Sequence, residues 1–211
     1  MANVNGSFGL RPLGVVGQAP SNQGMTEYRI ASGLASSIFQ GQLVIPLSTG
    51  FIGVTANAAG GTVGILGVFW GCEYTSSVTG KLVWSNYWPG SGADSSQPIK
   101  AFVYDNPAQL FVITSDATLT NEATARGHVF ANANLSTGVT GTDATGMSLG
   151  RLAVSTVNVT ANLNFRIMGI QEDPANADFT AAGIPVIVRL NNHYNSSNGG
   201  IAGGTVSTTG V

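Results

Sequence analysis

The sequence predicts an all-β protein, a sandwich or barrel of short antiparallel strands with an extended N-terminal arm and a flexible C-terminal tail. Apolar, β-branched and aromatic runs recur at roughly ten-residue spacing along the chain, which is typical of sandwiches and barrels. Glycine-containing turns separate these runs. No segment predicts a helix long enough for the crossover that a parallel βαβ unit requires. Together these observations favour antiparallel strands.

The chain divides into three predicted parts. Residues 1–24 form the arm, 25–194 a β-rich body, and 195–211 a tail of mostly Ser, Asn, Gly and Thr. The strand pattern weakens after residue 115, so a division of the body into two subdomains near 115–120 stays open.

The first 24 residues show neither helical nor strand periodicity and are rich in Gly and Pro. They carry apolar side chains, which would be exposed to water on a solvated tail. We therefore expect this segment to dock on a partner or a neighbouring copy. Arg11 would pair with a carboxylate there, and the isolated arm would be mobile. The candidate interface residues of the arm are Phe8, Leu10, Arg11, Pro12 and Leu13.

Within the body, strands are predicted at 26–30, 43–47, 51–55, 63–69, 72–75, 81–84, 99–104, 110–114, 149–159, 163–170 and 185–190. The second and third form a hairpin, and Pro46 favours an edge position because it cannot donate to a ladder. Gly64 and Gly67 indicate a bulge or a close backbone approach. Residues 119–126 predict one or two helical turns capped by Thr120. Loops are expected at 135–146 and 172–176.

Charge is scarce throughout the chain. Eight basic and ten acidic residues make up 9% of it, where soluble domains average about 25%. A neutral surface rich in hydroxyl and amide groups is easily desolvated, so we expect a protein packed against neighbours. A secreted or cell-surface β domain can share this composition and remains the alternative.

The scattered basic residues offer no cluster for phosphate, so neither nucleic acid nor an anionic membrane is expected as a partner. The N-terminus does not resemble a signal peptide, and no apolar stretch approaches the ~20 residues that span a bilayer.

The residues that usually carry chemistry are few and dispersed. Cys72 is expected to be a small buried hydrophobe. His128 and His193 lie far apart in the sequence; a hydrogen-bonding role is expected for His193, and neither is assigned a function. The carboxylates form no calcium loop. We expect no enzymatic activity, no metal and no cofactor, although a glycosidase with two distant carboxylates remains a third possibility.

The three tryptophans are predicted to differ in exposure. Trp70 and Trp84 lie in apolar or alternating runs and are expected in the core. Trp88 precedes a proline in a neutral loop, so Trp88 and its neighbour Tyr87 are predicted to be exposed interface anchors.

Several segments in order resemble the capsid cement, or head decoration, proteins of tailed bacteriophages. They are residues 2–12 (ANVNGSFGLRP), 71–74 (GCEY), 85–89 (SNYWP), 103–111 (VYDNPAQLF), 140–142 (TGT) with Ser148, and 186–193 (VIVRLNNH). One departure is Asn106, where an acidic residue is expected after Asp105; it weakens any expectation of a cation site in this turn.

This resemblance implies an all-β structural protein on the outer surface of an icosahedral virion, made in the host cytoplasm. It implies homo-oligomers, most often trimers, that bridge capsomers of the major capsid protein, and no catalytic residues. The alternative from another class is a phage or cell-surface module that binds glycans through Trp88 and its neighbours.

Overall fold

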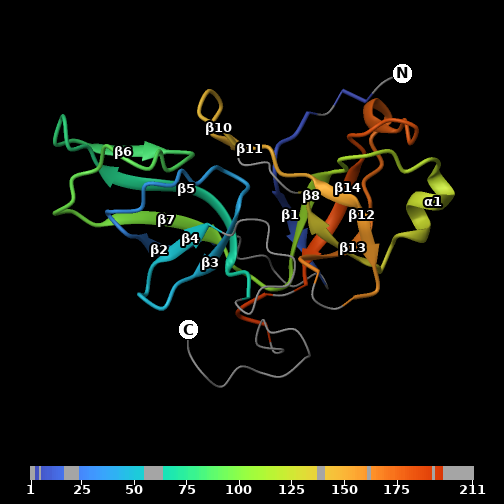
Figure 1. Cartoon of the computed structure of the whole chain (residues 1–211), viewed down its shortest axis with the longest axis horizontal. Helices are drawn as coiled ribbons and strands as arrows, with labels where there is room; N and C mark the ends of the chain where they lie inside the picture. Colours follow the sequence, from blue (N-terminus) through green and yellow to red (C-terminus); the bar gives the residue numbers. More distant parts are fainter. Residues whose placement is uncertain are drawn as a thin grey trace.

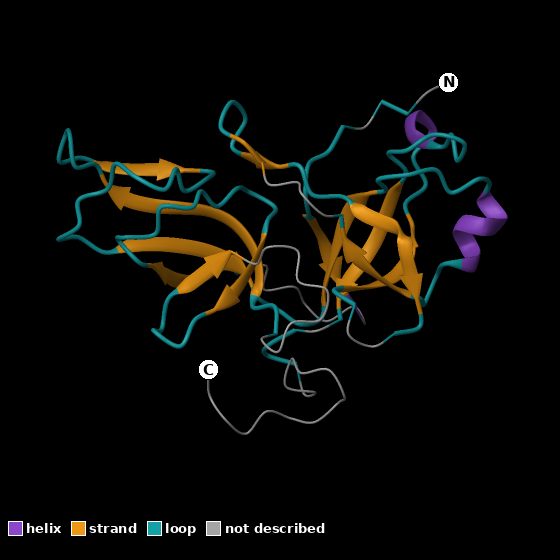
Figure 2. Cartoon of the chain, in the orientation of Figure 1, coloured by secondary structure: helices purple, strands orange, loops and turns teal. Residues whose placement is uncertain are grey.

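The computed structural model describes residues 3–4, 6–16, 24–54, 64–136, 141–160, 163–191 and 193–196. The described chain is mostly β, and the predicted fold class is confirmed. Two β units lie side by side, and the short helix α1 lies at the far end of the second unit (Figures 1 and 2). None of the described helices has the length and hydrophobicity needed to cross a bilayer.

The first unit is a closed five-stranded barrel. Its strands follow the order β3 (Leu43–Pro46), β4 (Ile52–Val54), β2 (Thr26–Ile30), β7 (Ile99–Tyr104) and β5 (Gly67–Thr75), and β3 pairs back with β5. β6 (Leu82–Ser85) pairs with β5 as an additional strand outside this closed ring. The barrel encloses a core that includes Ile30, Val44, Ile52, Phe69, Cys72, Trp88, Ile99, Ala101 and Val103.

The second unit is a six-stranded antiparallel sheet that curls on itself. Its order is β1 (Arg11–Val15), β8 (Gln109–Thr114), β14 (Pro185–Leu190), β13 (Phe165–Ile170), β9 (Asn132–Leu135) and β12 (Leu152–Asn158). A bridge between Ser115 and Leu152 joins the end of β8 to the start of β12. A separate ribbon of β10 (Gly141–Thr142) and β11 (Met147–Ser148) extends from this unit toward the first.

Most predicted strands are confirmed, and the differences have physical reasons. β3 is not an edge strand, because Leu43 and Val44 pair with β5, and Pro46 lies beyond that pairing. The predicted close approach at Gly67 is real: a Cβ there would lie 2.3 Å from the Tyr104 carbonyl oxygen. The bulge lies between Phe69 and Gly71 rather than at Gly64 or Gly67.

The weak middle segment contains more structure than the sequence predicts. Helix α1 spans Glu122–Gly127, and its cap is Asn121 rather than Thr120; the Asn121 side chain accepts the Thr124 N–H at 2.8 Å. β9 (Asn132–Leu135) was not predicted as a strand, and its last residue falls in the loop expected at 135–146, yet all four of its residues are buried. A one-turn 3₁₀ helix, η2 (Pro174–Asn176), occupies the predicted loop at 172–176.

The prediction that the N-terminal arm is not part of a core is wrong for residues 8–15. β1 pairs with β8, and Leu10, just before it, is fully buried in the core of the second unit. The Gly and Pro residues of this segment break the alternation by which a strand is recognised in sequence. Its pairing with β8 gives no local signal either, because β8 lies about a hundred positions away. Residues 1, 2, 5 and 17–23 of the predicted arm and 197–211 of the predicted tail lie outside the described residues.

The two units meet in a close backbone contact. The Leu10 N–H donates to the Gly41 carbonyl at 3.0 Å, and Gly9 and Gly41 both have φ in the left-handed region. A Cβ on Gly9 would lie 2.7 Å from the Gly41 oxygen and from Ser148 Cβ. Leu43 and Val68 of the barrel also join the core of the second unit. The units therefore share one packed interface.

This contact predicts that Gly9→Ala destabilises the protein more than Gly80→Ala. The two glycines have φ of 69° and 65°, but nothing lies within 4 Å of a Cβ on Gly80. Gly80→Ala should cost only the left-handed strain, about 1–2 kcal/mol, whereas Gly9→Ala should lose a further ~1–3 kcal/mol to overpacking. Urea unfolding of both variants measures the difference. Equal losses would mean that the contact at Gly9 relaxes freely.

Candidate interaction surface

Four of the seven predicted interface residues lie against one loop, residues 38–42. Phe8 and Leu10 reach it from the N-terminal segment, and Trp88 pairs with Ile38 from the opposite direction. Tyr87 stacks on Phe39 with ring centroids 5.8 Å apart. The structure therefore brings members of the two predicted groups close together, but three of the seven residues, Phe8, Leu10 and Trp88, are buried.

In the N-terminal group, Phe8 and Leu10 are buried, with 8% and 0% of their surface exposed. The Arg11 guanidinium lies 4.1 Å from the centroid of the Phe8 ring, an intramolecular cation–π contact, and its pairing with a carboxylate of a partner stays a prediction. Pro12 is half-buried in β1, and only Leu13, at 47%, presents a large apolar side chain to solvent.

The predicted exposures of two tryptophans are reversed. Trp88 is fully buried: its Nε1–H donates to the Leu34 carbonyl at 3.0 Å, and its ring meets Tyr74 edge-on. The loop that carries it folds over the barrel core instead of projecting. Trp84, expected in the core, is 66% exposed because β6 lies outside the closed barrel. Trp70 is half-buried.

One exposed and two half-buried aromatic side chains, Trp84, Trp70 and Phe102, lie on the outer face of the barrel, across β6, β5 and β7. Trp84 stacks on Phe102 with centroids 5.1 Å apart and planes 12° apart. Both line a shallow hollow of about 270 Å³ together with Trp70 and Met25. We call Met25, Trp70, Trp84 and Phe102 the aromatic shelf. In Figure 1, β6, β5 and β7 lie in succession on the outer side of the first unit.

Polar groups border the aromatic shelf. Ser85 and Asn86 line the same hollow. On the same outer face, the Lys100 ammonium lies between two carboxylates, 3.3 Å from Glu73 and 3.6 Å from Glu27. The charges near the shelf are therefore already paired, and its stacked rings are the groups left open for a contact.

The thiol beside this hollow is unreactive. Cys72 is fully buried, as predicted, and its Sγ–H donates to the Tyr87 carbonyl at 3.3 Å. Burial raises the pKa of Cys72 to about 12, so the side chain stays protonated at physiological pH. It acts as a small hydrophobe.

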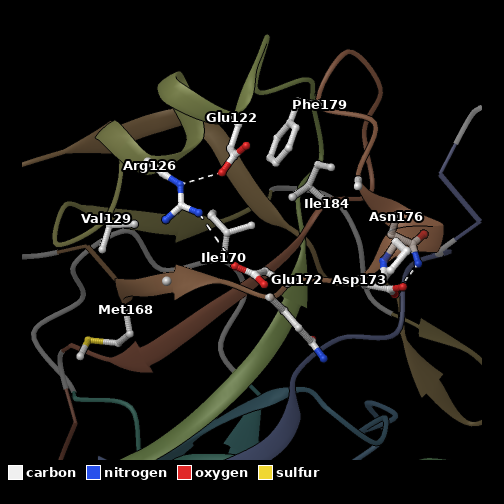
Figure 3. A pocket seen from close by; sticks show the side chains of 14 residues that line it. Glu122, Arg126, Val129, Met168, Ile170, Glu172, Asp173, Asn176, Phe179 and Ile184 are labelled. Carbon is white, nitrogen blue, oxygen red and sulfur yellow. Dashed lines mark hydrogen bonds and ion pairs between the residues drawn. The ribbon is translucent and has the colours of Figure 1, made fainter.

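A larger hollow of about 490 Å³ lies between α1, the end of β13 and the η2 turn (Figure 3). Its apolar side includes Met168, Ile170 and Phe179. The Arg126 Nε donates to Glu122 at 2.8 Å, and its guanidinium approaches Glu172 at 3.9 Å. Asp173, the fourth charged residue of the lining, accepts from the Asn176 side chain at 2.7 Å, so each charged group of this hollow has a partner within the chain.

The remaining polar side chains that could bind a ligand or a metal already form hydrogen bonds within the chain. Asp105 accepts hydrogen bonds from Thr26 (2.9 Å) and Tyr28 (2.7 Å), and burial with this bond raises the pKa of Tyr28 to about 12. Within the described part of the chain, no three His, Cys, Asp or Glu side chains gather closely enough to hold a metal ion.

His193 connects the segment after β14 to the first unit. It pairs with Ile65, and its Nδ1 accepts the Asn195 N–H at 3.1 Å, which confirms the predicted hydrogen-bonding role. Nε2 is buried, with no partner among the described residues. Burial lowers the pKa of His193 to about 4, against an opposing effect of the Asp105 charge.

No protein-family model, curated protein or solved structure matches this chain.

The buried histidine predicts a loss of stability in mild acid. The unfolded chain binds this proton near pH 6.5 and the folded chain only near pH 4, so the free energy of unfolding should fall between these values as pH decreases. The total loss would approach about 3 kcal/mol at ~1.4 kcal/mol per pKa unit. His193→Asn, which keeps a hydrogen-bond acceptor, should flatten this part of the profile. Denaturant unfolding from pH 7.5 to 4 tests it, and an unchanged slope in the variant would contradict it.

Proposed function

We propose that this chain is a structural virion protein that binds the outer surface of an icosahedral phage head and stabilises it by bridging capsomers of the major capsid protein. The aromatic shelf is the observation that carries the proposal. Trp84 is 66% exposed on a strand outside the barrel, in a chain of which only 9% is charged. Clustered apolar groups on a folded surface mark interaction sites.

The joined units support a bridging role. A protein that spans two capsomers transmits load only if it does not bend, and the shared core at Leu10, Leu43 and Val68 resists bending between the units. A ligand of the assembled lattice stabilises that lattice by mass action. In a homotrimer, the oligomer we propose, the contacts of three copies are linked and gain avidity.

The proposed partners are therefore the major capsid protein and further copies of this chain. The proposal assigns the chain no catalysis, cofactor, nucleic acid or membrane. It places the protein on the outer surface of the virion after synthesis in the host cytoplasm.

The glycan-binding alternative is favoured by one specific observation. Trp84 shares its hollow with Ser85 and Asn86, and an open aromatic ring beside neutral polar groups suits a sugar. Its anchor would be Trp84 and not Trp88, which is buried. The two functions differ in copy number: a cement protein is present in hundreds of symmetric copies per head, whereas a glycan-binding module needs no such repetition.

The shelf can be tested by substitution. Trp84→Ala should weaken binding to heads that lack the protein by at least tenfold, because central interface aromatics commonly contribute about 2 kcal/mol or more. Phe130→Ala is the matched control, since Phe130 is 74% exposed on the other unit. Cosedimentation with purified heads measures both affinities. Equal weakening by both variants would show that the shelf is not the contact.

The cement function itself is tested on particles with and without the protein. Depleted heads should release DNA at lower temperature and under milder osmotic shock than complete heads, and added protein should restore their resistance. Fluorescent dye access to the packaged DNA during heating reports the release. If depleted heads retain DNA as well as complete heads, the protein is not a cement and the glycan-binding function becomes the leading candidate.

A further inference from the structure

Two arginines lie directly opposite each other on the outer face of the second unit. Arg166 of β13 and Arg189 of β14 are register partners in an antiparallel pair, so their side chains share one face. Their sequence neighbours Phe165, Ile167, Val188 and Leu190 are buried in the core, which directs both arginines away from it.

No acidic side chain in the described part of the chain neutralises the pair. All ten acidic side chains lie within the described residues, and the ion pairs described for them involve Arg29, Lys100 and Arg126. Arg166 donates only through Nε to the Asn132 side chain at 3.3 Å. The Arg189 Nε is buried and has no hydrogen-bond partner among the described residues.

This arrangement is unfavourable for the isolated chain. Like charges directly opposite on a sheet repel each other, and a buried donor without an acceptor loses its bonds to water without replacement. An unsatisfied group of this kind is explained when its partner arrives from another molecule.

The arginines line a hollow of about 300 Å³ that can admit such a partner. Its other walls are the Pro107–Ala108 turn, before β8, and Asn191 and Ser196, after β14. We propose that Arg166 and Arg189 bind a carboxylate carried by a partner protein. Guanidinium groups bind carboxylates with two parallel hydrogen bonds, and the pair presents two such groups side by side. The small hollow and the net charge of −2 disfavour a nucleic-acid backbone.

The first test uses the isolated full chain and two small anions, succinate and inorganic phosphate, at constant ionic strength. Succinate should raise the melting temperature of the wild type along a saturating curve. Arg189→Gln should weaken the apparent affinity at least tenfold, while Arg126→Gln, which removes an arginine already paired with Glu122, should leave it unchanged. Equal responses in the two variants would overturn the proposal. Saturation by phosphate without succinate would overturn the carboxylate assignment.

The second test needs no ligand. Arg189→Met keeps the aliphatic stem but removes the charge and the orphaned donor, so the isolated variant should melt about 2 °C or more above the wild type at low salt. A lower melting temperature would show that the guanidinium has a structural role, contrary to the proposal. Both tests are independent of phage heads, so the arginine site and the proposed cement function can fail separately.

Discussion

The contact of Gly9 and Leu10 with Gly41 is the constraint on which the joined structure depends. Gly41 accepts from the Leu10 N–H and donates its own N–H to Phe69 at 2.8 Å, so one residue ties the N-terminal segment to the barrel wall. The ribbon joins the same loop, because Gln40 exchanges backbone hydrogen bonds with Gly146 and Ser148. Side chains at the glycines would force these backbones apart. The left-handed glycines therefore determine how closely the units pack.

Because the chain has few charged residues, it is possible to say for most of the basic residues which group of the chain each one contacts. Arg126, Lys100 and Arg29 have carboxylates nearby, and Arg11 lies over an aromatic ring. Neutral hydroxyl and amide groups satisfy much of the remaining polar surface, as where Asp105 accepts from a threonine and a tyrosine. A protein of this composition has little long-range electrostatic steering, so its recognition depends on shape and on a few local contacts.

The local sequence pattern predicted where many strands lie, but it could not predict which side chains are covered, because that depends on contacts between segments far apart in sequence. β2, β7 and β14 follow from β-branched and aromatic runs bounded by turns, and their bounds agree with the structure. Period two places Leu82 and Trp84 on one face of β6, but it cannot say whether that face is covered, since closure of the barrel by β3 and β5 leaves β6 outside. Trp88 differs from its prediction in the opposite direction. Its loop contains turn residues, which predicted exposure, yet the loop folds back over the core and buries the ring. Arg166 and Arg189 gave no local signal, because only the pairing of β13 with β14 brings them together.

The two proposed contacts lie on different units, the aromatic shelf on the first and the arginine pair on the second. If both engage one lattice, the second contact forms at an effective concentration fixed by the geometry of the first. A flexible linker would dilute this gain through its conformational freedom, whereas a packed junction retains it. The Gly9–Gly41 contact would then matter for attachment as well as for folding. Loosening it would weaken binding through the lost coupling of two intact surfaces, with neither surface altered.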